Sequence, residues 1–154
     1  MIVVSACLCG VNCKYNGGNN LNEEVLKLFR KGEAVLICPE QLGGQTTPRP
    51  AHEIFNAEGS DVLDGKACIK GPEGDDATKQ FVKGAYEALK IAKECDAHVA
   101  ILKARSPSCG CGEVYDGSFT GGIRKGNGVT AELFLRNGIK VYTEENYYET
   151  LHAF

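Results

Sequence analysis

The chain has 154 residues, 43% of them apolar, and a formal net charge of −3, which suits one globular domain with its own core over residues 1–154. The negative charge argues against a protein that binds bulk nucleic acid, because such proteins normally present a basic surface. No apolar run is long enough to span a membrane and the N-terminus does not resemble a signal peptide, so we expect a cytoplasmic protein.

Strands and helices are predicted to alternate along the chain. Residues 2–4 and 34–38 are short apolar runs typical of strands. Between them, residues 19–33 predict a helix with Asn20 or Asn22 as its cap and Gly32 at its end. Its apolar stripe is expected to consist of four residues: Val25, Leu26, Leu28 and Phe29.

The second half of the chain continues this alternation. Residues 76–95 and 128–138 have the apolar spacing of helices, and residues 98–104 and 139–143 read as strands. Residues 41–74 are rich in glycine, proline and turn dipeptides, and we expect a loop there with at most one hairpin. The pattern predicts an α/β fold with a mostly parallel sheet flanked by helices and a Gly/Pro-rich loop or hairpin insertion.

Cysteines follow three of the predicted strands. The first strand leads into "SACLCGVNC", the second into "CPEQLGG" and the third into "RSPSCGCG". Ligands of such sheets bind outside the carboxyl ends of the strands. If the strands are parallel, these three loops meet at one edge and each brings at least one thiol there.

Clustered thiols in a cytoplasmic protein favour a metal site over a disulfide scaffold. Zinc and iron–sulfur clusters are the candidates, since both select thiolate ligands. A structural zinc site usually shows C-x-x-C pairs, and none occurs among the eight cysteines. Single ligands from three loops suit an iron–sulfur cluster better. A 4Fe–4S cluster with three protein thiolates would retain one open iron, as catalytic metal sites do.

Polar residues near these cysteines suggest chemistry. Glu40 could act as a general acid or base, or could simply cap a helix or lie on the surface. Ser106 and Ser108 flank a proline and could orient a substrate, although a local turn is the commoner use of such serines. Arg49 lies between two prolines and could bind a polar substrate edge, or could be an ordinary solvated loop residue.

The chain resembles the TudS-like thiouracil desulfidases along nearly its whole length. The segments that carry the resemblance occur in the same order as in that family: "SACLCG", "KYNGG", "CPEQLGG", "TPRP", "DVLDGKA", "LKARSPSCG", "YDGSF", "GNGVTA" and "NGIKV". The resemblance implies a small Rossmann-like domain with a 4Fe–4S cluster on three cysteines, whose fourth iron takes the sulfur of a thiolated base. It also implies that the cell's cluster-assembly machinery loads the protein.

Matched position by position, the resemblance implies that Cys7, Cys38 and Cys109 are the cluster ligands. It makes Glu40 the catalytic acid or base and Ser106 the assisting serine. The implied reaction is hydrolytic removal of sulfur from a small base or nucleoside such as 2-thiouracil, which gives the oxo base and hydrogen sulfide. Arg49 and Ser108 are expected to bind the substrate.

Two expectations complete the sequence-based hypothesis. The other cysteines of the three loops, Cys9, Cys13 and Cys111, are less favoured as ligands. Cys7 and Cys9 in particular are two residues apart, about 7 Å in an extended segment, which makes joint ligation of one small cluster awkward. The alternative function is a non-catalytic zinc or iron–sulfur module for sulfide transfer or redox sensing.

Overall fold

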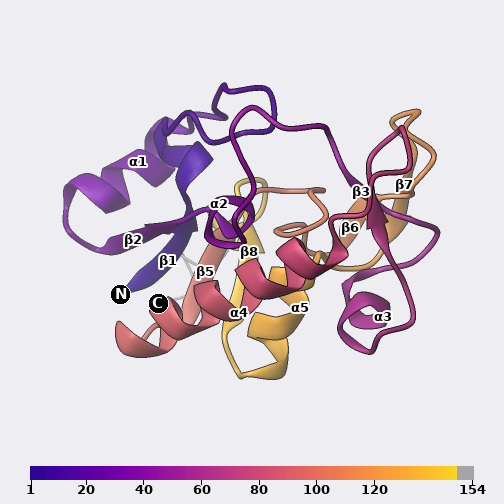
Figure 1. The fold of residues 1–154 in the computed structure, drawn as a ribbon. Helices are drawn as coiled ribbons and strands as arrows, with labels where there is room; N and C mark the ends of the chain where they lie inside the picture. The colour runs from indigo at the N-terminus through magenta and orange to yellow at the C-terminus, as the bar shows by residue number, and fades with distance from the viewer. Residues whose placement is uncertain (149–154) are drawn as a thin grey trace.

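Four parallel strands form the central sheet of residues 1–148, the part of the chain that the computed structural model describes (Figure 1). Their spatial order is β2 (Ala34–Ile37), β1 (Ile2–Ser5), β5 (Val99–Leu102) and β8 (Lys140–Thr143). Helices α1 (Glu23–Arg30), α4 (Thr78–Glu94) and α5 (Val129–Arg136) lie between successive strands in the chain. The predicted α/β class is confirmed. Within these residues no helix has the length and apolar character needed to cross a membrane.

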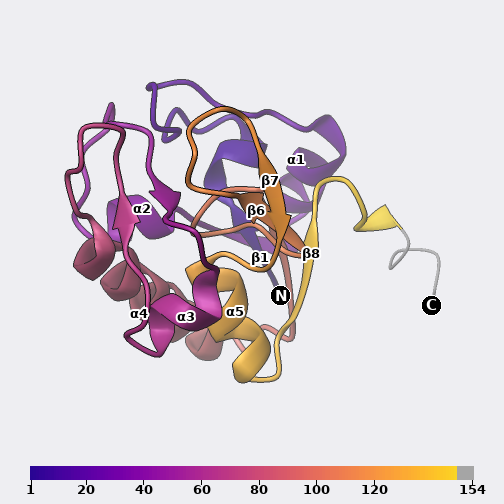
Figure 2. The same ribbon diagram turned by 90° about the vertical axis from the view of Figure 1, so that its right-hand side faces the viewer.

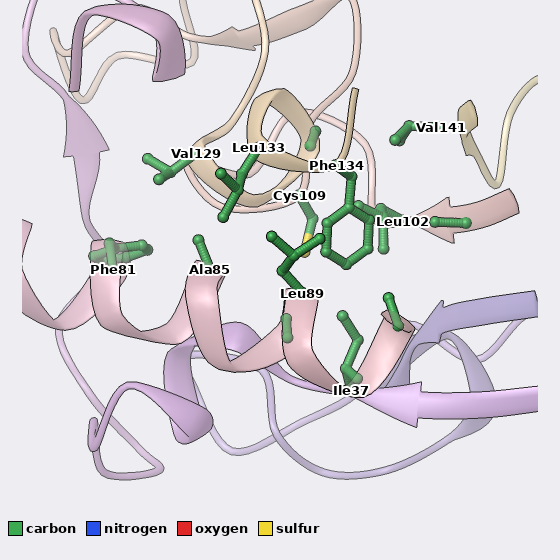
Figure 3. Packing of buried hydrophobic residues seen from close by; sticks show 14 of the residues in the cluster. Ile37, Phe81, Ala85, Leu89, Leu102, Cys109, Val129, Leu133, Phe134 and Val141 are labelled. Atoms are coloured by element: carbon green, nitrogen blue, oxygen red, sulfur yellow. The ribbon is translucent and has the colours of Figure 1, made fainter. Parts of the chain in front are cut away.

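The helices cover opposite faces of the sheet (Figures 1 and 2). On one face, Val25 and Leu28 of α1 pack in a buried cluster with Val4 of β1. On the other face, Leu89 of α4 and Phe134 of α5 belong to a larger buried cluster (Figure 3). From β1 the chain runs to β2 on one side and later to β5 on the other. The crevice at the carboxyl ends of β1 and β5 is therefore the switch point, where α/β folds place their ligands.

Helix α1 follows the prediction at its cap but not along its whole apolar stripe. The Asn22 side chain accepts hydrogen bonds from the backbone N–H groups of Glu24 and Val25 at 3.1 and 3.2 Å, so Asn22 is the N-cap. The prediction that Phe29 joins the stripe is wrong, since Phe29 is 45% exposed. Leu28 already occupies the sheet-facing position, and the next residue points about 100° away around the helix.

The structure adds several short elements, and among them the sequence anticipated only a hairpin within residues 41–74. They are η1 (Ala6–Cys9), α2 (Pro39–Leu42), β3 (Glu53–Ile54), α3 (Gly59–Leu63), β4 (Ile69–Lys70), β6 (Glu113–Tyr115) and β7 (Ile123–Lys125). β3 and β4 pair antiparallel within the Gly/Pro-rich segment, but α3 lies in their connection, so they are not joined by a tight turn. Apart from η1, each of these elements mixes polar and apolar residues and lacks the continuous apolar run that marks the four-residue strands β1, β2 and β5.

Helix α2 is held against α4 by a close backbone approach. A Cβ atom added at Gly84 of α4 would lie 1.8 Å from the carbonyl oxygen of Pro39. A Cβ atom added at Gly43, just after α2, would lie 2.0 Å from the carbonyl oxygen of Gln80. Because Cys38 and Glu40 sit at the start of α2, this contact sets where both side chains lie.

Gly84→Ala is therefore expected to destabilise the protein, although a Gly-to-Ala change inside a helix normally stabilises by about 1 kcal/mol. The new methyl group would overlap the Pro39 backbone, and overpacking of this kind costs about 1–3 kcal/mol. Urea unfolding measures the difference. Lys83→Ala, one exposed position earlier, is the control and should stay within about 0.5 kcal/mol of wild type. A stabilised Gly84→Ala protein would contradict the close approach.

Candidate functional site

Three strand exits deliver thiols to one cavity at the carboxyl edge of the sheet. Cys7 lies in η1 directly after β1, Cys38 directly follows β2, and Cys109 lies in the loop after β5. All three line a cavity of about 530 Å³, together with Glu40 and Arg49. The parallel register of β1 with β2 and β5 brings these exits together.

Cys7 is held by a loop that folds back over it. Its carbonyl oxygen accepts hydrogen bonds from the backbone N–H groups of Gly10 at 3.2 Å and Asn20 at 3.0 Å. Burial raises the pKa of the Cys7 thiol, and a hydrogen bond with the Asn20 side chain opposes that rise. The side chain is thus largely removed from solvent while it still lines the cavity.

Cys38 occupies the N-cap position of α2, where Pro39 starts the helix. Its Sγ lies 3.8 Å from the carbonyl oxygen of Cys13 and 3.6 Å from Oε2 of Glu40. A hydrogen bond with the Cys13 thiol lowers the pKa of Cys38 and raises that of Cys13. Cys13 is only 2% exposed and lines the same cavity, so the structure places it beside the three thiols.

Cys109 lies at the boundary between the cavity and the apolar core (Figure 3). The Ser5 hydroxyl donates to its Sγ at 3.4 Å, and the Ser108 hydroxyl oxygen also lies 3.4 Å from it. Burial raises the pKa of this thiol. The loop is fixed to the start of α5, because a Cβ atom added at Gly128 would lie 2.5 Å from the carbonyl carbon of Ser108.

Glu40 is the polar centre of the site. The Ser108 hydroxyl donates a short hydrogen bond to its Oε1, which leaves Oε2 on the side of Cys38. The Ser106 hydroxyl lies 3.3 Å from that of Ser108 and accepts a hydrogen bond from the backbone N–H of Cys109 at 2.8 Å. Ser106 therefore forms a local turn with Cys109, the common use of a serine at such a position. It also lines the cavity.

Arg49 joins two of the site loops. Its Nη2 donates to the carbonyl oxygen of Cys13 at 2.9 Å, and its Nη1 donates to Oγ1 of Thr47 at 3.1 Å. Its backbone N–H donates to the carbonyl oxygen of Tyr15 at 2.8 Å. The guanidinium group thus braces the cavity wall on which it lies.

Cys9 and Cys111 lie outside the residues that line the cavity. Cys9 packs against the buried cluster under α1, and the Cys111 thiol lies 3.6 Å from the carbonyl oxygen of Val141. Among residues 1–148 no three cysteine, histidine or acidic side chains converge closely enough to hold a single metal ion. A cluster places its thiolates farther apart, because each binds a different iron.

Sequence reasoning missed several residues of this cavity. Ser5, Lys103, Tyr115 and Phe119 line it without having been singled out. Ser5 and Lys103 both lie at the carboxyl ends of strands, and this position could have identified them as candidate site residues. The backbone N–H of Lys103 donates to the Ser5 hydroxyl at 2.9 Å, and its ammonium group pairs with Glu144 at 2.8 Å. The aromatic residues come from the β6–β7 hairpin, which the sequence pattern did not reveal.

Comparison with known proteins gives consistent matches over the chain. The profile of a family described as 2-thiouracil desulfurase matches residues 2–146. The uncharacterized protein YbbK of Bacillus subtilis (strain 168) is 46% identical over 144 residues, which cover 94% of this chain and 95% of that protein. The solved structure of the 4Fe–4S-dependent thiouracil desulfidase TudS matches with a TM-score of 0.86 and 36% identity, covering 99% of this chain and 95% of the other.

Proposed function

The chain belongs to the 2-thiouracil desulfurase family, and from that premise we propose that it removes sulfur from a small thiolated base or nucleoside such as 2-thiouracil. The products would be the oxo base and hydrogen sulfide. The observation that carries the proposal is the cavity in which Cys7, Cys38 and Cys109, delivered by separate strand exits, lie together with Glu40. The family match agrees with the resemblance drawn from the sequence motifs.

The donor set fits a 4Fe–4S cluster held by Cys7, Cys38 and Cys109. Four soft thiols line the cavity, those of these three residues and of Cys13, and the similar structure belongs to a 4Fe–4S-dependent enzyme. A structural zinc site would usually draw on paired thiols, whereas single thiols from separate strand exits suit a cluster better. When bound, a cluster with one iron free of protein ligands supplies a thiophilic Lewis acid for the thiocarbonyl sulfur.

We infer that Glu40 moves the protons of the reaction. A water molecule adds its oxygen to the thiocarbonyl carbon, the carbon–sulfur bond breaks, and both protons of that water end on the departing sulfur. Glu40 accepts one of these protons at Oε2 and returns it to the sulfur, since Oε1 is held by Ser108. No net electron transfer is needed for this hydrolysis.

The neighbouring polar groups hold this arrangement in place. Ser108 is fully buried and fixes the direction of the Glu40 carboxylate, whereas Ser106 reaches the cavity and is the serine available to a substrate or a water molecule. Arg49 lies in the loop between α2 and β3 and lines the cavity. Its guanidinium group would bind the polar edge of the substrate. Together they would hold a small heterocycle near Glu40 before water attacks.

Anaerobic turnover tests the proposed function. Protein reconstituted with iron and sulfide should bind about four irons and four sulfides per chain. It should then convert 2-thiouracil or 4-thiouracil, seen as loss of thiocarbonyl absorbance and release of hydrogen sulfide. A loaded protein that releases sulfide from no thiolated base would favour the non-catalytic sulfide-transfer or redox-sensing module. Stoichiometric zinc without labile sulfide would overturn the cofactor assignment.

A further inference from the structure

Strands β6 and β7 form a hairpin (Figure 2). Two aromatic residues of this hairpin line the cavity. Tyr115 ends β6 and Phe119 lies in the loop that follows, and both are 37% exposed. Exposure of a single aromatic residue needs no explanation. Two rings that line the same cavity as the proposed catalytic groups suggest a role in binding.

The loop that presents Phe119 is tightly built. Oδ1 of Asp116 accepts hydrogen bonds from the backbone N–H of Ser118 at 2.9 Å and from its hydroxyl at 2.5 Å. The backbone N–H of Asp116 donates to the carbonyl oxygen of Gly122 at 3.0 Å, which closes the loop. The position of Phe119 is therefore set by specific bonds.

The backbone of Phe119 adopts a conformation that is rare for its residue type. Its φ angle is 58°, in the left-handed region that glycine favours. Such outliers persist where surrounding structure holds them, and they concentrate at ligand sites. Oε1 of Glu53 supplies part of that hold, since it accepts from the backbone N–H groups of Gly117 at 3.0 Å and Phe119 at 3.3 Å.

We propose that Phe119 and Tyr115 form the wall on which the planar ring of the substrate base stacks, and that Glu53 positions this wall. The inference rests on the proposed function, because it assigns the recognition of the base within the same cavity. Aromatic side chains bind heterocycles through their faces, and this contact tolerates different substituents on the ring. The wall therefore recognises the ring of a thiolated pyrimidine, while Glu40 and Ser106 face the reacting atoms.

Steady-state kinetics with 2-thiouracil test the wall. Phe119→Ala should raise KM about tenfold or more, the effect expected when one base–aromatic stack is removed, and should leave kcat within about twofold. Phe119→Tyr keeps an aromatic face and should restore KM. Phe29→Ala removes a similarly exposed ring from α1, away from the cavity, and should behave as wild type.

Amide hydrogen exchange and KM together test whether Glu53 positions this wall. Glu53→Ala should speed hydrogen exchange at the Gly117 and Phe119 amides and raise KM, whereas Glu53→Gln keeps an acceptor oxygen and should change neither. The double variant Glu53→Ala/Phe119→Ala should be no worse in KM than Phe119→Ala, because Glu53 acts through Phe119.

The possible failures are distinguishable. If the wild-type protein turns over 2-thiouracil and Phe119→Ala keeps the wild-type KM, the proposed stacking of the base on Phe119 is wrong. The desulfidase function would still stand. If Glu53→Ala leaves the exchange of both amides unchanged, the positioning role is wrong. If the wild-type protein desulfurises no thiolated base, the proposed function fails and the wall fails with it.

Discussion

Cys7→Ser protein, reconstituted anaerobically, is expected to bind far less than one cluster per chain and to lose turnover by more than about a hundredfold. That exceeds the usual effect of changing a residue that only supports a ligand. The physical reason is that a serine hydroxyl does not provide the soft thiolate that iron in a cluster selects. Iron and acid-labile sulfide analysis, with the visible absorbance of the cluster, measures the loss directly.

Cys9→Ser is the matched control for this experiment. Both cysteines lie in η1, but Cys7 lines the cavity and Cys9 packs under α1. Cys9→Ser should therefore keep the cluster and its turnover. Cys13→Ser is the harder test, because Cys13 is buried beside Cys38 in the cavity itself. Loss of the cluster in Cys13→Ser with retention in Cys7→Ser would move the ligand assignment.

Glu40→Ala is expected to keep the cluster and to lose turnover of 2-thiouracil by about a hundredfold or more, the scale of a general acid or base. The carboxylate lies 3.6 Å from the Cys38 thiol through Oε2 and is oriented by Ser108 through Oε1. Removing it takes away the proton carrier but none of the three proposed ligands. Single-turnover kinetics on protein of measured iron content separates a loss of proton transfer from a loss of the cluster.

Two further variants sharpen the interpretation of Glu40. Glu33→Ala removes an exposed carboxylate just before β2, at the end of that strand away from Cys38. This variant should keep the turnover of the wild-type protein. Ser108→Ala keeps the carboxylate but frees it to rotate, and should reduce kcat less than Glu40→Ala does. Full activity of Glu40→Ala at normal iron content would refute the proposed proton transfer.

Much of the architecture could be predicted from periodicity alone. The strands of the sheet and the helices α1, α4 and α5 each carry a long enough apolar pattern to be recognised, and their alternation implies a parallel sheet. Once the strands are parallel, cysteines that follow them must gather at one edge. The convergence of Cys7, Cys38 and Cys109 on a single cavity is thus a consequence of local sequence and general topology.

Other features of the site follow from contacts between distant segments. Ser106 and Ser108 are equivalent as sequence, yet Ser108 binds Glu40 and Ser106 binds the backbone of Cys109. The difference arises because the loop after β5 is pinned to α5 at Gly128 while α2 is pinned to α4 at Gly84. The local sequence therefore does not predict whether Ser106 or Ser108 will bind the Glu40 carboxylate.

By itself the sequence determined the fold class, the edge of the sheet that carries the site and the chemistry of thiols beside a carboxylate. These depend on residue type and on spacing along the chain. The tertiary structure alone decided that Cys13 lies beside Cys38 and that Cys9 does not line the cavity. It also decided that Glu53 holds the loop of Phe119 at the cavity wall. The contact of Cys13 with Cys38 spans 25 residues of chain and that of Glu53 with Phe119 spans 66, and such contacts exist only when separate elements pack against one another.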